Sequence, residues 1–208
     1  MRTPVTADDV DLAVSSAVSL LRPALHLDWR VPAGGLTWSC WETLEHAADD
    51  LFAYALQLGP KQPPTDAYVP VVCLPARDGG PRSSIFVEAA SGNAGVLQVL
   101  EGCAALLVGV VTITPSEVRA FHGLGVSDPE GFAAMGIVEV LAHTHDVASG
   151  LGLSFVPPAD LCDRVLRRLF PDAPTETERW PTLLWATGRG ELPGRPALTE
   201  WRWDVTPR

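Results

Sequence analysis

A glutamate and a histidine stand four residues apart inside an apolar run, and this pair constrains the fold more than any other feature. Glu139 and His143 lie in the segment 136–146, where Ile, Val, Leu and Ala surround the pair. On a helix, residues at this spacing project from the same side, about 6 Å apart along the axis. Glu and His are rarely buried without a partner. The apolar surroundings therefore favour a buried helix with a shared partner over a solvated ion pair.

A divalent metal is the partner that suits a carboxylate and an imidazole together. A third ligand must come from elsewhere, and His46 in the helical run 41–50 is the best candidate. Periodicity alone favours a surface position for His46, because it points away from the apolar face of its helix. The small and polar stripe that includes Thr43, Ala47 and Asp50 instead suits the wall of a wet pocket. Two His and one Glu would leave a coordination position open, as in catalytic sites.

Three other polar residues are candidates for the same site. Asp146 lies one turn after His143 and could orient its imidazole, or it could be an ordinary polar residue near the helix end. Asp50 could act as a base or support a ligand, so we assign Asp50 and Asp146 to the catalytic group. His122 lies in a loop between glycines and could line a cofactor pocket. His145 is turned about 200° from His143 and cannot share its metal.

Four long segments with helical periodicity predict a mainly all-α fold. A long crossover with a short hairpin, from the β-branched runs 68–73 and 84–87, separates the second helix from the third, and 119–125 reads as a loop. This pattern is typical of a four-helix bundle spanning 1–152, with 153–208 as an appendage of two short helices and a strand or extended arm at 201–205. The expected long helices lie near 8–25, 38–58, 94–112 and 129–149.

Composition limits the partners of the chain. A formal net charge of −10 without a dense Lys/Arg run argues against nucleic acid and anionic membrane. The longest apolar stretch, 103–113, is too short to span a bilayer. The N-terminus has no signal peptide pattern, and the four cysteines form no CxxC, which indicates reduced thiols in a cytosol. We expect a cytoplasmic protein with small-molecule partners, and whether it forms a homodimer stays open.

Three segments, 38–46, 120–136 and 139–146, resemble the DinB-like superfamily, in the branch of the N-terminal domain of mycothiol-dependent maleylpyruvate isomerase. The resemblance covers roughly residues 8–152. It implies a four-helix bundle that holds a divalent ion, usually zinc, through His46, Glu139 and His143, with water or the thiolate of a small thiol at the open position; nickel is the alternative metal. Residues 153–208 do not match that enzyme's C-terminal domain, and no substrate-binding arginine can be placed among Arg189, Arg195 and Arg202.

The preferred hypothesis is a metalloenzyme that uses mycothiol or a similar thiol for thiol transfer or isomerisation of a small electrophile. A metal held by two neutral His and one carboxylate lowers the pKa of a bound thiol or water. A metal-hydroxide hydrolase would need the same open site, so the sequence does not separate these two. A non-catalytic metal-binding stress protein is favoured if a side chain closes the open position. We do not expect Cys40 to do so, because it lies about 120° around the helix from His46.

Overall fold

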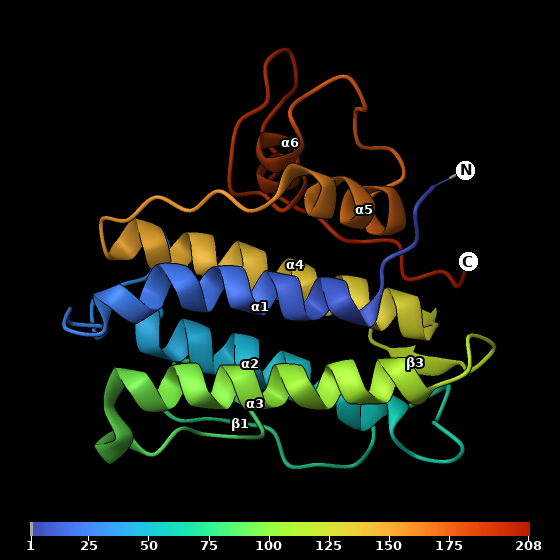
Figure 1. Cartoon of the computed structure of the whole chain (residues 1–208), viewed down its shortest axis with the longest axis horizontal. Helices are drawn as coiled ribbons and strands as arrows, with labels where there is room; N and C mark the ends of the chain where they lie inside the picture. Colours follow the sequence, from blue (N-terminus) through green and yellow to red (C-terminus); the bar gives the residue numbers. More distant parts are fainter. Residues whose placement is uncertain (1) are drawn as a thin grey trace.

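The computed structural model describes residues 2–208 and is mainly helical. Four long helices run side by side, and a smaller helical layer lies beside them (Figure 1). The strands are short and form two separate two-stranded hairpins. The elements are α1 (Ala7–Leu21), η1 (Arg22–Ala24), α2 (Cys40–Leu58), β1 (Leu74–Pro75), β2 (Arg82–Ser83), η2 (Ala89–Ser91), α3 (Gly92–Ile113), β3 (Ala120–His122), β4 (Gly125–Ser127), α4 (Pro129–Gly150), α5 (Ala159–Leu169) and α6 (Arg179–Ala186).

The packing of the long helices places α4 in the core. Helices α1 and α2 each pack against both α3 and α4, and α4 is buried along most of its length. Gly136 permits a close approach of these helices, because a Cβ there would lie 2.8 Å from Leu107 of α3 and 2.9 Å from Leu51 of α2. The facing sides of α2 and α4 therefore meet in the interior, where a polar side chain needs a partner.

Side-chain caps fix where three of the four long helices begin: α1, α2 and α4. The Asp9 carboxylate accepts a hydrogen bond from the Thr6 backbone N–H at the start of α1. Ser39 and Glu42 form a capping box at α2. At α4, Asp128 accepts from the Gly131 N–H, and Pro129 takes the first helical position. These starts agree with the sequence-based bounds to within about two residues, the usual uncertainty of helix ends.

The crossover from α2 to α3 contains a hairpin, but not between the two expected runs. Strands β1 and β2 pair Leu74 with Ser83, while all of 68–73 and all of 84–87 lie outside the strands. The second run is held by α2 instead, because its backbone N–H groups donate to side chains there. Asp49 accepts from Ser84 and Ile85, and Glu45 accepts from Val87.

The segment expected as a loop at 119–125 also belongs to a hairpin. Strand β3 pairs with β4, with Ala120 opposite Ser127 and His122 opposite Gly125. Only three residues pair on each side, so the segment is too short for an alternating pattern to stand out in the sequence.

The C-terminal residues pack against α4 near both of its ends. Helix α5 packs against α4 and α6. The tail 201–205 is extended and forms no strand, although Trp203 is buried and the Asp204 N–H donates to the Leu169 carbonyl. The buried Arg168 guanidinium joins this layer to α4 through a hydrogen bond of 2.8 Å to Asp128.

Within residues 2–208, one helical stretch is long and apolar enough to cross a membrane. It is Ala89–Ile113, with a mean hydropathy of 2.1 in its most apolar window and a third of that window buried. We expected no stretch long enough to span a bilayer, because we considered only the unbroken apolar run 103–113 and not the longer helical stretch that contains it. Core helices pass the same test of length and composition, so the stretch is weak evidence for a membrane span.

Candidate metal centre

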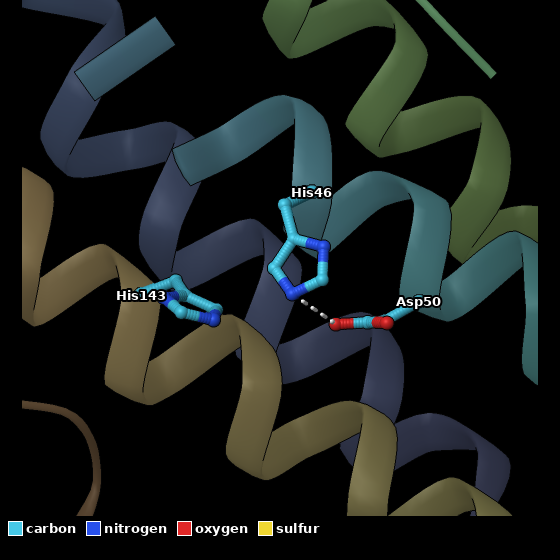
Figure 2. A group of neighbouring side chains, drawn as sticks. All are labelled: His46, Asp50 and His143. Atoms are coloured by element: carbon cyan, nitrogen blue, oxygen red, sulfur yellow. Dashed lines mark ion pairs between the residues drawn. The ribbon is translucent and has the colours of Figure 1, made fainter. Parts of the chain in front are cut away.

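Two imidazoles and two carboxylates meet between α2 and α4. His46, Asp50 and His143 each offer a ligand atom, and these atoms lie within 4.8 Å of one another (Figure 2). His46 Nε2 is 3.4 Å from Asp50 Oδ2, and His143 Nε2 is 3.3 Å from Glu139 Oε2. The two imidazole ring centroids are 5.4 Å apart. This cluster has the residue types and the spacing of a divalent metal site.

The cluster contains the three expected ligands and one more. The sequence predicts His46, Glu139 and His143 as the ligand set and gives Asp50 a catalytic role. In the structure, the ligand atoms of His46, Asp50 and His143 lie close together, and Glu139 stands beside them in contact with His143. Asp50 follows His46 by four residues, just as His143 follows Glu139. The four-residue spacing that predicts convergence of Glu139 and His143 therefore predicts the same for His46 and Asp50.

Two polar atoms of the cluster are buried without a hydrogen-bond partner among residues 2–208: His46 Nδ1 and Asp50 Oδ2. An unpaired buried polar atom costs about 1–3 kcal/mol, and a charged one costs more. A cation bound between the carboxylates would offset this cost for Asp50. Two imidazoles and two carboxylates suit zinc and also nickel, iron or manganese. The donor chemistry thus fits a resident divalent ion.

The metal-free cluster divides into a charged pair and a neutral pair. Burial lowers the pKa of His46 to about 4, and the charge of His143 adds to this. Burial raises the pKa of Asp50 well above its usual range, with a further increase from Glu139. Burial opposes charge at Glu139 and His143 too, but their mutual hydrogen bond lowers the pKa of Glu139. That bond and a second one to Asp146 raise the pKa of His143.

Asp146 links His143 to the C-terminal layer. Its Oδ2 atom lies 3.2 Å from His143 Nδ1, and Arg189 donates to both carboxylate oxygens from Nε at 3.0 Å and to Oδ2 from Nη2 at 2.9 Å. If Nδ1 carries the proton, Nε2 is left free to bind a metal. The sequence places Asp146 near His143 but gives no sign of Arg189, because the two residues are 43 positions apart.

A pocket of about 580 Å³ opens at the His143 side of the cluster. His46, Asp50 and Glu139 do not line this pocket, yet 21%, 20% and 17% of their side-chain surface is exposed, against 7% for His143. Solvent therefore reaches these three side chains outside the pocket. A larger pocket of about 640 Å³ lies between α5, α6 and the tail, away from the metal ligands, and Trp201 lines both. The smaller pocket is lined by Gly34, Gly35, Leu36, Trp38, His143, His145, Asp146, Ser149, Thr187, Gly188, Arg189 and Trp201.

The remaining sequence candidates lie outside the cluster. His122 on β3 packs between Tyr54 and Trp203, with ring centroids 6.1 Å and 5.9 Å away, and does not line the pocket at His143. His145 lines that pocket and packs against Trp180. The Cys40 thiol faces the Val147 and Pro32 carbonyls, and burial raises its pKa to about 11.

Comparison of the chain with protein-family models, with curated proteins and with solved structures gave no match. The residues of the cluster and the pocket beside it are therefore the basis on which the function is argued.

Proposed function

We propose that this chain is a DinB-like four-helix bundle that holds a divalent metal and acts as a thiol-dependent metalloenzyme. The observation that carries the proposal is the convergence of His46, Asp50, Glu139 and His143 between α2 and α4. Zinc is the preferred ion, with nickel as the alternative. The cosubstrate would be a low-molecular-weight thiol such as mycothiol, and the substrate a small electrophile that undergoes thiol transfer or isomerisation.

The metal would supply one piece of chemistry, which is to lower the pKa of a thiol or water bound to it. The residues of the chain prepare the site for this. Asp146 holds the His143 ring in one orientation, and Arg189 in turn fixes Asp146. Because Arg189 also keeps Asp146 ionised, the proton on His143 is drawn to Nδ1 and away from the ligand atom.

The pocket supports small-molecule partners. Its volume of about 580 Å³ lies within the range of ligand sites, about 300–1,000 Å³. It is lined by the aromatic rings of Trp38 and Trp201 and by the polar groups of Ser149, His145 and Arg189. A pocket with aromatic walls and a few polar groups could hold a thiol and an electrophile next to His143.

A metal-binding protein without turnover is the second candidate, and the position of Asp50 favours it. If Asp50 binds the metal together with His46, Glu139 and His143, a tetrahedral ion has four protein ligands and no open position. If Asp50 stays outside the coordination sphere, three protein ligands leave the fourth position to a thiol. The two candidates thus differ in the role of one carboxylate.

Metal analysis combined with thermal shifts tests the proposal. The purified protein should hold one divalent ion per chain, and His143→Ala should lose it. Mycothiol should raise the melting temperature of the metal-loaded protein and leave that of the metal-free protein unchanged. Glu139→Gln should abolish this increase. If His143→Ala still holds one metal ion per chain, the proposed metal site is refuted. The second candidate is favoured if the protein binds metal but thiol does not change its melting temperature, and if Asp50→Asn loses metal as completely as His143→Ala.

A further inference from the structure

The larger pocket lies in the C-terminal layer, where the end of α5, helix α6 and the tail meet (Figure 1). Four aromatic rings line it, those of Phe170, Trp185, Trp201 and Trp203. The ring of Trp201 lies 6.3 Å from that of Phe170 and 5.5 Å from that of Trp203, inclined by 45° and 69°. The rings therefore form a corner and not a flat stack. The volume of about 640 Å³ lies within the range of small-molecule sites, about 300–1,000 Å³.

Two of these indoles are not used up by packing within the chain. Trp203 is buried in the core, but Trp201 keeps 37% of its surface exposed and Trp185 is half-buried. The Trp185 Nε1–H donates to the Pro196 carbonyl over 2.9 Å, so this indole is held in place and offers the pocket its carbon surface. A ligand that covered these rings would gain the free energy of burying them.

The charged groups around the pocket favour a cation. Three carboxylates line it, those of Asp172, Glu200 and Asp204, against the single guanidinium of Arg202. Arg208 lies 2.8 Å from Asp204 and compensates that carboxylate. Asp172 and Glu200 are exposed and outnumber Arg202. The chain also carries a formal net charge of −10, so an anion would be repelled and a cation attracted.

The same layer already holds one cation against an indole. The Arg195 guanidinium lies 5.9 Å from the centroid of the Trp185 ring, and its Nη2 atom is 3.7 Å from Glu176. A cation within about 6 Å of an aromatic face is attracted by it, most strongly by that of Trp. Arg195 does not line the pocket, so the cavity is not filled by this side chain. Inside the pocket the same combination of an indole and an acid recurs in Trp201 and Glu200.

We propose that this pocket is a binding site for a small organic cation that carries a quaternary ammonium group. Such a group has no N–H to donate, so aromatic faces and nearby carboxylates suit it better than directed hydrogen-bond acceptors do. The site goes beyond the proposed function, because no residue of the metal cluster lines it and it requires neither a metal nor a thiol.

The test compares two probes of the same shape on the full chain. Choline carries a trimethylammonium group, and 3,3-dimethylbutan-1-ol has carbon in place of its nitrogen. Saturation-transfer NMR titrations of their methyl signals give both affinities at constant ionic strength. The variants are Trp201→Ala and Glu200→Gln. Trp38→Ala is the control for the smaller pocket, which Trp201 also lines, and Glu191→Gln removes an exposed acid that lines neither pocket. Circular dichroism melts confirm that each variant folds.

Choline should bind the wild type at least about fivefold more tightly than the alcohol, as expected from one cation–π contact. Trp201→Ala should remove most of this preference. Glu200→Gln should weaken choline about two- to threefold, the effect of an exposed charge, and leave the alcohol unchanged; this variant decides if Trp201→Ala does not fold. Trp38→Ala and Glu191→Gln should bind choline like the wild type. Equal binding of the two probes, no saturable binding of choline, or a loss in Trp38→Ala instead of Trp201→Ala would each overturn the site.

Discussion

Asp50→Asn should stabilise the metal-free protein at neutral pH and weaken its metal binding. Asp50 keeps about a fifth of its side-chain surface exposed, but its Oδ2 atom is buried without a hydrogen-bond partner. Its neighbour His46 does not compensate the charge, because its pKa of about 4 leaves it neutral at pH 7. Burial raises the pKa of Asp50, and the negative charge of Glu139 raises it further. Asn keeps the shape of the side chain but cannot ionise, so it avoids the cost of protonating Asp50 at neutral pH.

The size and the pH dependence of this effect follow from the burial. The gain in the free energy of unfolding is what it costs the folded wild type to keep Asp50 protonated or charged at pH 7, about 1.4 kcal/mol for each pH unit by which its folded pKa exceeds the unfolded one. Because burial raises the pKa of Asp50 in the folded state, the folded protein holds its proton more tightly than the unfolded chain. The metal-free wild type should therefore gain stability as pH falls from 7 towards the unfolded pKa of about 3.9, and the advantage of Asp50→Asn should shrink.

Asp49 provides the control, because it is the adjacent acid on the same helix. It is buried, and its Oδ1 atom accepts hydrogen bonds from the Ser84 and Ile85 N–H groups at 2.8 and 2.9 Å. Asp49→Ala leaves both donors without an acceptor and should cost about 1–3 kcal/mol. It lies outside the ligand cluster, so its zinc affinity should match the wild type.

Urea unfolding in the presence of a chelator at pH 7 and pH 5 measures the stability, and zinc titration of each variant measures the affinity. If metal-free Asp50→Asn were less stable than the wild type at pH 7, Asp50 would be satisfied in the folded protein and the reasoning would fail. Unchanged zinc affinity in Asp50→Asn would show that this carboxylate lies outside the coordination sphere and would return the fourth position to an external ligand.

Three further variants test the surroundings of the cluster. Arg189→Ala should weaken zinc binding about 10- to 100-fold in a competition titration, because Asp146 then no longer orients His143; equal affinity in Arg189→Ala and the wild type would contradict this. Arg168→Ala should cost about 3–5 kcal/mol in urea unfolding, since it leaves Asp128 buried and without its cation. His145→Ala should keep its metal by elemental analysis, because its ring packs against Trp180.

The helices could be predicted from the sequence because their signals are local. A cap and its partner lie within three residues of each other, as with Ser39 and Glu42, and apolar periodicity needs only the segment itself. The end of α1 shows the limit of such signals. The apolar pattern extends to Leu25, but Pro23 changes the last turn to the 3₁₀ helix η1. Proline lacks the N–H that would continue the α-helical hydrogen bonds.

The crossover could not be predicted in the same way, because residues far away in the sequence determine its path. The run 84–87 is rich enough in β-branched and aromatic residues to suggest a strand, yet its N–H groups bind Glu45 and Asp49. A carboxylate on a neighbouring helix satisfies these donors as well as a strand would. Nothing in the sequence of the run indicates which of the two acceptors it meets.

The cluster of polar side chains between α2 and α4 depends on both local and long-range features of the sequence. Each half is local, since a pair at i and i+4 must converge on a helix, and this holds for His46 with Asp50 as well as for Glu139 with His143. The helical wheel indicated a surface position for His46 because it measures only the apolar face, whereas α2 packs against both α3 and α4 and buries a second face. On that second face a polar pair meets the polar pair of α4. The sequence signal for Asp50 is therefore a His and an acid four residues apart on the small, polar face of a helix whose opposite face is apolar. Such a face is buried when the helix packs against two neighbours.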